Sequence, residues 1–159
     1  TITFSESFTS PYLVFEHLAI LESITEDQQV YLNINSPGGN VDLGLMLANG
    51  IKQCRGEVTT IAVGFCASAG TIAWAAGKHR RMAPGAYLMF HGPLTSMSGM
   101  MNNQMLASDI TYTADVFNTF LKDMKDNNIL SEEELDSIIT KNLDVFIPQI
   151  VYDKRMGVA

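Results

Sequence analysis

The chain has 159 residues, of which 47% are hydrophobic and 17% charged, a composition typical of a soluble globular protein of one domain. Its formal net charge of −7, from 10 basic and 17 acidic residues, argues against a nucleic-acid or anionic-membrane partner, because both require clustered positive charge. No apolar run approaches the roughly 20 residues that span a bilayer, and no secretory signal opens the sequence. We therefore expect a cytoplasmic protein.

Cys54 and Cys66 form no CxxC motif and have no Cys/His cluster at zinc spacing, so we expect two reduced thiols and no metal. The sequence begins at Thr1, close to the first predicted helix. It leaves open whether a leader or another N-terminal segment precedes this residue.

The first predicted helix covers about residues 11–24, where a hydroxyl cap and a proline precede an apolar residue spacing typical of a helix. Alternation of apolar and polar residues predicts a strand at residues 30–35, and SPGGN at residues 36–40 ends it. An apolar stripe then predicts a second helix at residues 43–54.

Residues 58–64, VTTIAVG, predict a second strand, and the small residues of SAGTIAWAAG at 68–77 are compatible with a helix. AYLMFHGP at residues 86–93 predicts a third strand that ends at Gly-Pro. We interpret the basic run KHRR at residues 78–81 as a solvated turn, with an anion site as the alternative. This order of elements implies βαβ crossovers and an α/β fold with a mainly parallel sheet.

A methionine-rich apolar stripe predicts a long helix at about residues 98–125. Its length suits an arm that projects towards another subunit, and packing as a core helix is the equal alternative. Ser131 and Glu134 form a capping box that opens a further helix through about Lys141.

Three motifs follow predicted strands: SPGG after the first, FCAS after the second, and His91 at the end of the third. Ligands usually bind at this edge of a parallel sheet. Ser68 is therefore either a small packing residue or a nucleophile. Of the other two histidines, His17 lies in an apolar helix stripe and His79 in the basic run, which leaves His91 as the candidate base.

A serine becomes nucleophilic when an imidazole takes its proton, and a carboxylate must orient that imidazole. The attack also creates an oxyanion that N–H donors must stabilise. The glycines of SPGG and the amide of Ala69, directly after the serine, are candidate donors.

Three stretches resemble the ClpP family, the proteolytic subunit of Clp protease: INSPGG at residues 34–39, GFCASAGTIAWAAG at 64–77 and GKHRRMAPGAYLMFHGP at 77–93. The resemblance runs from about Val30 to Phe146. It implies a ClpP/crotonase-like α/β fold built from ββα and βαβ units, with a mainly parallel sheet and a projecting handle helix. In the single domain that it implies, residues 1–93 and 128–159 form the head and residues 94–127 form the handle.

The resemblance assigns Ser68 as the nucleophile, His91 as the general base and acid, and Gly39 with Ala69 as the oxyanion hole. It places the third triad member in NLDVF, which nominates Asp144. Asp136, inside a predicted helix, and Asp153, beyond the match, are weaker candidates.

The same resemblance implies a serine endopeptidase of two stacked heptameric rings that degrades unfolded polypeptides to short peptides. An AAA+ unfoldase, such as a ClpX-like or a ClpA/ClpC-like ATPase, would deliver these substrates. The chain carries no GxxxxGK[ST] phosphate loop, so we expect no cofactor here and ATP hydrolysis by the partner.

The sequence departs from the family pattern at four places. Ala69 replaces the usual Met, Gly92 replaces Gln, LTSMSGMMNN at residues 94–103 replaces a glycine-rich strand, and IPQIVYDKRMG at 147–157 replaces the last helix. Two alternatives remain: a non-catalytic ring subunit, and a crotonase-type acyl-CoA enzyme. The second is disfavoured because no Asp or Glu lies near FCASAG.

Overall fold

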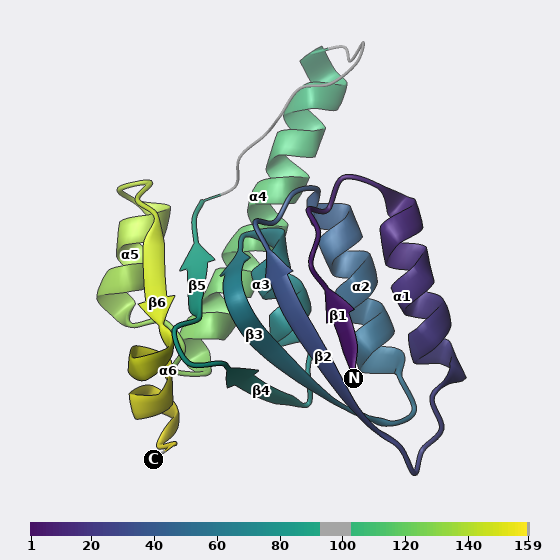
Figure 1. Ribbon diagram of the computed structural model, residues 1–159. Helices are drawn as coiled ribbons and strands as arrows, with labels where there is room; N and C mark the ends of the chain where they lie inside the picture. Colours follow the sequence, from purple (N-terminus) through teal and green to yellow (C-terminus); the bar gives the residue numbers. More distant parts are fainter. Residues whose placement is uncertain (93–102, 159) are drawn as a thin grey trace. The chain divides into compact units, whose positions relative to one another are not determined.

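The computed structural model describes residues 1–92 and 103–158 of the chain (Figure 1). They form two compact units: unit 1 comprises Thr1–Met89 and Phe146–Ala159, and unit 2 comprises Phe90–Val145. Each unit is described by itself below. The division into head and handle, whose first boundary falls at residues outside the described ranges, stays a prediction.

Unit 1 is built on a six-stranded sheet with the order β1-β2-β3-β5-β6, in which β4 also pairs with β3. The strands are β1 (Ile2–Phe4), β2 (Gln29–Ser36), β3 (Glu57–Ala67), β4 (His79–Met82), β5 (Tyr87–Phe90) and β6 (Val145–Pro148). The four pairings with a defined register, β1–β2, β2–β3, β3–β4 and β3–β5, are parallel. This confirms the predicted α/β class with its mainly parallel sheet and the three predicted strands.

Four helices belong to unit 1: α1 (Pro11–Ser23), α2 (Val41–Gln53), α3 (Ala69–Ala75) and α6 (Gln149–Met156). The first three confirm the helices expected at these positions. The run after Asp144, which departs from the family pattern, still forms a helix. Pro148 precedes that helix with φ −65°, a value that suits the residue before a first turn.

One face of the sheet carries the core of unit 1. Val30, Leu32 and Ile34 of β2 are buried, whereas Tyr31 between them is exposed. The helices α1 and α2 lie side by side (Figure 1). A Cβ at Gly50 of α2 would overlap the end of the Leu18 side chain of α1, which would then have to shift.

The prediction of a solvated turn at residues 78–81 is wrong, because His79–Met82 forms β4 and pairs with Thr59–Ala62 of β3. The side chains of this run are polar, but its backbone is paired in the sheet and accepts further hydrogen bonds. The carbonyl of Arg81 accepts the indole N–H of Trp74 at 3.0 Å, and the carbonyl of Arg80 accepts the hydroxyl of Tyr152 at 3.0 Å. An edge strand tolerates charged side chains, so the hydrophobic pattern of the sequence does not predict that this run is paired.

Unit 2 contains α4 (Asn103–Asp126) and α5 (Glu132–Ile139). The helix α4 confirms most of the long helix predicted at residues 98–125, and residues 98–102 lie outside the described ranges. Its last turns pack in unit 2, where Phe117, Leu121 and Met124 are buried. Its role as a projecting arm stays a prediction.

The capping box at the start of α5 is confirmed. The Ser131 hydroxyl accepts the Glu134 N–H at 3.2 Å, and the Glu134 carboxylate accepts the Ser131 N–H at 2.7 Å.

Within residues 1–92 and 103–158, no helix combines the length and the apolar character that crossing a membrane requires.

Candidate active site

Ser68 occupies a strained junction between β3, which ends at Ala67, and α3, which begins at Ala69. Its backbone angles are φ 52° and ψ −124°, a region that side-chain-bearing residues rarely adopt. The Ser68 N–H donates to the Met89 carbonyl at 3.0 Å, and its carbonyl accepts the N–H of Thr71 at 2.9 Å and the hydroxyl of Thr71 at 2.6 Å. Strain that neighbouring contacts maintain is characteristic of functional positions.

The SPGG turn lies directly against Ser68. Gly38 has φ 93°, and a Cβ built on it would lie 2.6 Å from the Ser68 Cβ and 3.1 Å from the Ala69 nitrogen. No side chain fits in that space, so glycine is required at this position for both steric and conformational reasons. Unit 1 therefore brings together two motifs that are 30 residues apart in the sequence.

Two backbone N–H groups beside Ser68 remain available to a ligand. Ala69 is the first residue of α3, so its N–H has no acceptor within the helix. Gly39 has φ 135° and faces Phe8, whose neighbours in the hydrogen-bond pattern are Gly38 and Asn40. Within the described residues, neither the Gly39 N–H nor the Ala69 N–H has a hydrogen-bond acceptor.

The Ser68 side chain is only 8% exposed, and its hydroxyl has no hydrogen-bond partner among the residues that the structure describes. Small neighbours surround it: Ala67, Ala69 and Gly70.

His91 is the residue directly after β5; it belongs to unit 2 and is half-buried. Its ring stacks on Phe117 with a centroid distance of 5.9 Å and an interplanar angle of 28°. Its Nδ1 hydrogen-bonds with the carbonyl of Gly92. The predicted partnership with Ser68 of unit 1 stays a prediction.

Asp144 is exposed and lies between α5 and β6, in the same unit as His91. The loop before it reaches the chain next to His91, because the Asn142 Oδ1 atom lies 3.0 Å from the position of a Cβ at Gly92. Within the described residues, no hydrogen bond or ion pair joins Asp144 to His91. The structure thus brings the loop of Asp144 to the residue after His91 without closing the contact.

The two weaker carboxylate candidates have other partners. Asp136 accepts the Thr140 hydroxyl at 2.8 Å and pairs with the Lys141 ammonium at 3.0 Å. These hydrogen bonds, that of Lys141 first, hold the pKa of Asp136 below its usual value. Asp153 accepts the side-chain amide of Gln149 in unit 1.

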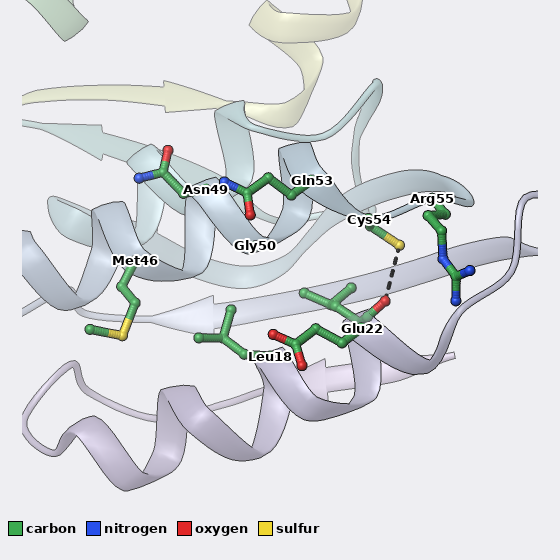
Figure 2. A pocket seen from close by; sticks show the side chains of 9 residues that line it. Leu18, Glu22, Met46, Asn49, Gly50, Gln53, Cys54 and Arg55 are labelled. Atoms are coloured by element: carbon green, nitrogen blue, oxygen red, sulfur yellow. Dashed lines mark hydrogen bonds between the residues drawn. The ribbon is translucent and has the colours of Figure 1, made fainter.

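A cavity of about 460 Å³ lies between α1 and α2, away from this site (Figure 2). None of its lining residues belongs to the candidate site. One of them is Cys54, whose S–H group donates a hydrogen bond to the Leu21 carbonyl at 3.5 Å (Figure 2).

The second cysteine, Cys66, is buried in β3, and burial raises the pKa of its thiol. Neither thiol belongs to the candidate site.

Two residues of this region were not predicted from the sequence. Phe8 forms an isolated parallel bridge with Gly39, and Ser36 accepts the Gly38 N–H on its hydroxyl at 3.1 Å. Phe8 makes this contact through its backbone, so no pattern of side chains in the sequence predicts it. The only signal for Ser36 is a hydroxyl directly before a Pro-Gly-Gly turn.

Comparison with known proteins agrees with the arrangement of motifs. A model of the Clp protease family matches residues 6–144. The chain is 33% identical over 121 residues to an ATP-dependent Clp protease proteolytic subunit of Leuconostoc citreum. The aligned segment covers 73% of this chain and 60% of that protein.

Two cyanobacterial relatives are also similar. The identity is 39% to proteolytic subunit 2 of Prochlorococcus marinus and 40% to proteolytic subunit 3 of a Synechococcus species, each over 65% of this chain. The chain spans 53% and 54% of these two relatives. With a family match over most of its length and the motifs assembled around Ser68, the chain belongs to the Clp protease family.

Proposed function

We propose that the chain is a serine endopeptidase, the proteolytic subunit of a self-compartmentalised ATP-dependent protease. The observation that carries this proposal is the backbone of Ser68, held at φ 52° with Gly38 packed against it. A packing serine has no need of this conformation, which costs of order 1–3 kcal/mol. A nucleophile gains from it, because the turn between a strand and a helix presents the hydroxyl beside free N–H groups.

In the proposed acylation, the Ser68 Oγ attacks the peptide carbonyl carbon and a C–O bond forms. The Ser68 proton passes to the imidazole of His91, and the carbonyl oxygen becomes an oxyanion that accepts hydrogen bonds from the Gly39 and Ala69 N–H groups. The C–N bond then breaks as the imidazolium returns that proton to the leaving amine. Water repeats the sequence to release the acyl group.

Asp144 is the proposed carboxylate that orients His91 and stabilises its cation. Its place in unit 2, on a loop that reaches Gly92, supports this role. Asp136 is less suited, because its carboxylate is already engaged by Lys141 and Thr140.

The proposed assembly is two stacked heptameric rings that enclose the active sites, fed with unfolded polypeptides by an AAA+ ATPase. The relatives are named ATP-dependent, and in this proposal the partner, not this chain, hydrolyses ATP. The chain itself needs no cofactor. The two free cysteines suit a reducing compartment such as the cytoplasm.

Covalent labelling tests the nucleophile. A serine-reactive fluorophosphonate probe should label the wild-type chain and not Ser68→Ala, because the probe forms a bond only to an activated hydroxyl. Ser23→Ala, on the exposed side of α1, is the matched control and should label like the wild type. Equal labelling of wild type and Ser68→Ala contradicts the proposal.

Hydrolysis of a small fluorogenic peptide by the purified chain separates an active subunit from a non-catalytic ring subunit. Such a peptide needs no unfolding, so cleavage should proceed without ATPase or ATP. Turnover of a crotonyl thioester without peptide cleavage would instead favour an acyl-CoA enzyme.

A further inference from the structure

A second serine lies beside the candidate nucleophile, and the reaction proposed above does not use it. Ser36 ends β2, is 1% exposed and opens the SPGG turn. We propose that Ser36 is a positioning residue: its hydroxyl fixes the Pro37–Gly38 peptide and the backbone of Phe8 fixes the Gly38–Gly39 peptide, so that the Gly39 N–H meets the oxyanion formed at Ser68. This inference rests on the proposed peptidase function.

The Ser36 hydroxyl supports the turn from inside the sheet. Its Oγ accepts the N–H of Gly38 at 3.1 Å, in a buried contact. The register of β2 against β3 shifts between Ile34 and Ser36, so that Ser36 pairs with Cys66. Such an irregularity redirects a side chain at the end of a strand. Here the redirected hydroxyl binds the backbone of its own turn.

Phe8 holds the same turn from the opposite side. Its N–H donates to the Gly38 carbonyl at 2.8 Å, and its carbonyl accepts the Asn40 N–H at 2.9 Å. The described residues contain no cis peptide bond, so the Gly38 carbonyl and the Gly39 N–H point in opposite directions. Because Phe8 binds the carbonyl, the Gly39 N–H is directed away from Phe8 and remains free for a ligand.

The turn needs such support because it has little rigidity of its own. Gly38 and Gly39 have φ values of 93° and 135°, and neither has a side chain to restrict it. An oxyanion donor acts within a narrow range, about 2.7–3.1 Å from the oxygen. Without the Ser36 hydroxyl, the buried Gly38 N–H loses its acceptor, and the Pro37–Gly38 peptide is expected to rotate towards another one. That rotation changes the backbone angles of Gly38 and with them the direction of the Gly39 N–H.

Packing alone does not explain the hydroxyl. Ser36 is 1% exposed and its Cβ lies 3.3 Å from the position of a Cβ at Gly70, so a small residue suits this buried position beside Gly70. Alanine suits it as well as serine does. The change Ser36→Ala therefore removes the hydrogen bond and leaves the packing in place, which makes the two roles separable.

Peptide hydrolysis and fluorophosphonate labelling test the role on three variants. The oxyanion exists only in the transition state, so Ser36→Ala should lower kcat about 10- to 100-fold with KM within about twofold, and slow labelling by a similar factor. Ser36→Cys keeps a weaker acceptor and should fall between Ser36→Ala and the wild type.

Thr60→Val is the matched control. Thr60 is fully buried in β3 and its hydroxyl donates to the Trp74 carbonyl at 2.6 Å, so its loss removes a comparable hydrogen bond outside the turn. We expect this variant to lose stability, followed by the fluorescence of Trp74, the one tryptophan of the sequence, and to keep kcat within about twofold.

The outcomes separate the two proposals. If the wild type labels and Ser68→Ala does not, but Ser36→Ala keeps its kcat or loses no more than Thr60→Val, the nucleophile stands and the role of Ser36 is overturned. A change in KM alone overturns it too. If wild type and Ser68→Ala label equally, the peptidase function fails and the role of Ser36 fails with it.

Discussion

In unit 1 the candidate nucleophile and its oxyanion donors are held by backbone contacts, whereas in unit 2 the candidate base and carboxylate depend on side chains with few contacts. Ser68 is 8% exposed and its peptide groups bond to Met89 and Thr71. Asp144, by contrast, is exposed, and His91 has a ring contact with Phe117 and a hydrogen bond with the carbonyl of Gly92.

This difference teaches that the two halves of the proposed chemistry have different tolerances. The oxyanion donors are main-chain groups, so side-chain substitutions reach them only through the shape of the turn. The groups that move the proton are side chains, so a single substitution removes them outright. Effects on activity and on stability should therefore separate at the candidate side chains of unit 2 and coincide at the SPGG turn of unit 1.

The largest expected effect is that of His91→Ala. Without a base the Ser68 hydroxyl is not activated, and kcat should fall about 10⁴-fold or more, as for the loss of other triad members. The folded state should lose only about 1 kcal/mol, from the ring contact with Phe117. Peptide hydrolysis and chemical denaturation measure the two effects. His79→Ala, at an exposed position of β4, is the control and should keep its activity.

Asp144→Asn should have the next largest effect, a loss of up to about 10⁴-fold in kcat, because a neutral amide neither stabilises the imidazolium nor fixes its tautomer. The unfolding midpoint should hardly change, since the side chain is exposed. Asp136→Asn provides the contrast, with kcat within about twofold of the wild type. If Asp136→Asn lost the activity and Asp144→Asn kept it, the assignment of the carboxylate would be reversed.

Gly38→Ala should lower kcat about 10²-fold, the cost of displacing one oxyanion donor, and should also destabilise unit 1. The new Cβ would lie 2.6 Å from the Ser68 Cβ, so either the turn or the serine must move. Gly85→Ala is the matched control: Gly85 has φ 78°, but nothing lies within 4 Å of its Cβ position. It should lose about 1 kcal/mol of stability and no activity.

Much of unit 1 could be predicted from the sequence, because hydrophobic periodicity and turn residues mark its main elements. The alternation around Leu32 and the SPGG break give β2 and its turn, and the stripe that includes Leu47 gives α2. The motifs also identified Ser68 with Gly39 and Ala69, which the structure places around one turn of unit 1.

The remainder was hidden because it depends on backbone groups. Phe8 holds the turn through its N–H and carbonyl, which every residue possesses. The strand β4 was mistaken for a turn because its charged side chains conceal a paired backbone. The positive φ of Ser68 could not be predicted either, since serine ordinarily avoids that region and the hydrogen bonds with Met89 and Thr71 that hold its backbone exist only in the folded chain.

The placement of residues 146–159 in unit 1 has a consequence for synthesis. Tyr152 of α6 packs edge-on against Trp74 with a centroid distance of 5.5 Å, and its hydroxyl donates a hydrogen bond to the carbonyl of Arg80. All of unit 2 lies between these partners in the chain, so the ribosome completes it before α6 exists. The core of unit 1 is therefore expected to form after unit 2 has been synthesised, which would delay the maturation of the strained serine until α6 has left the ribosome.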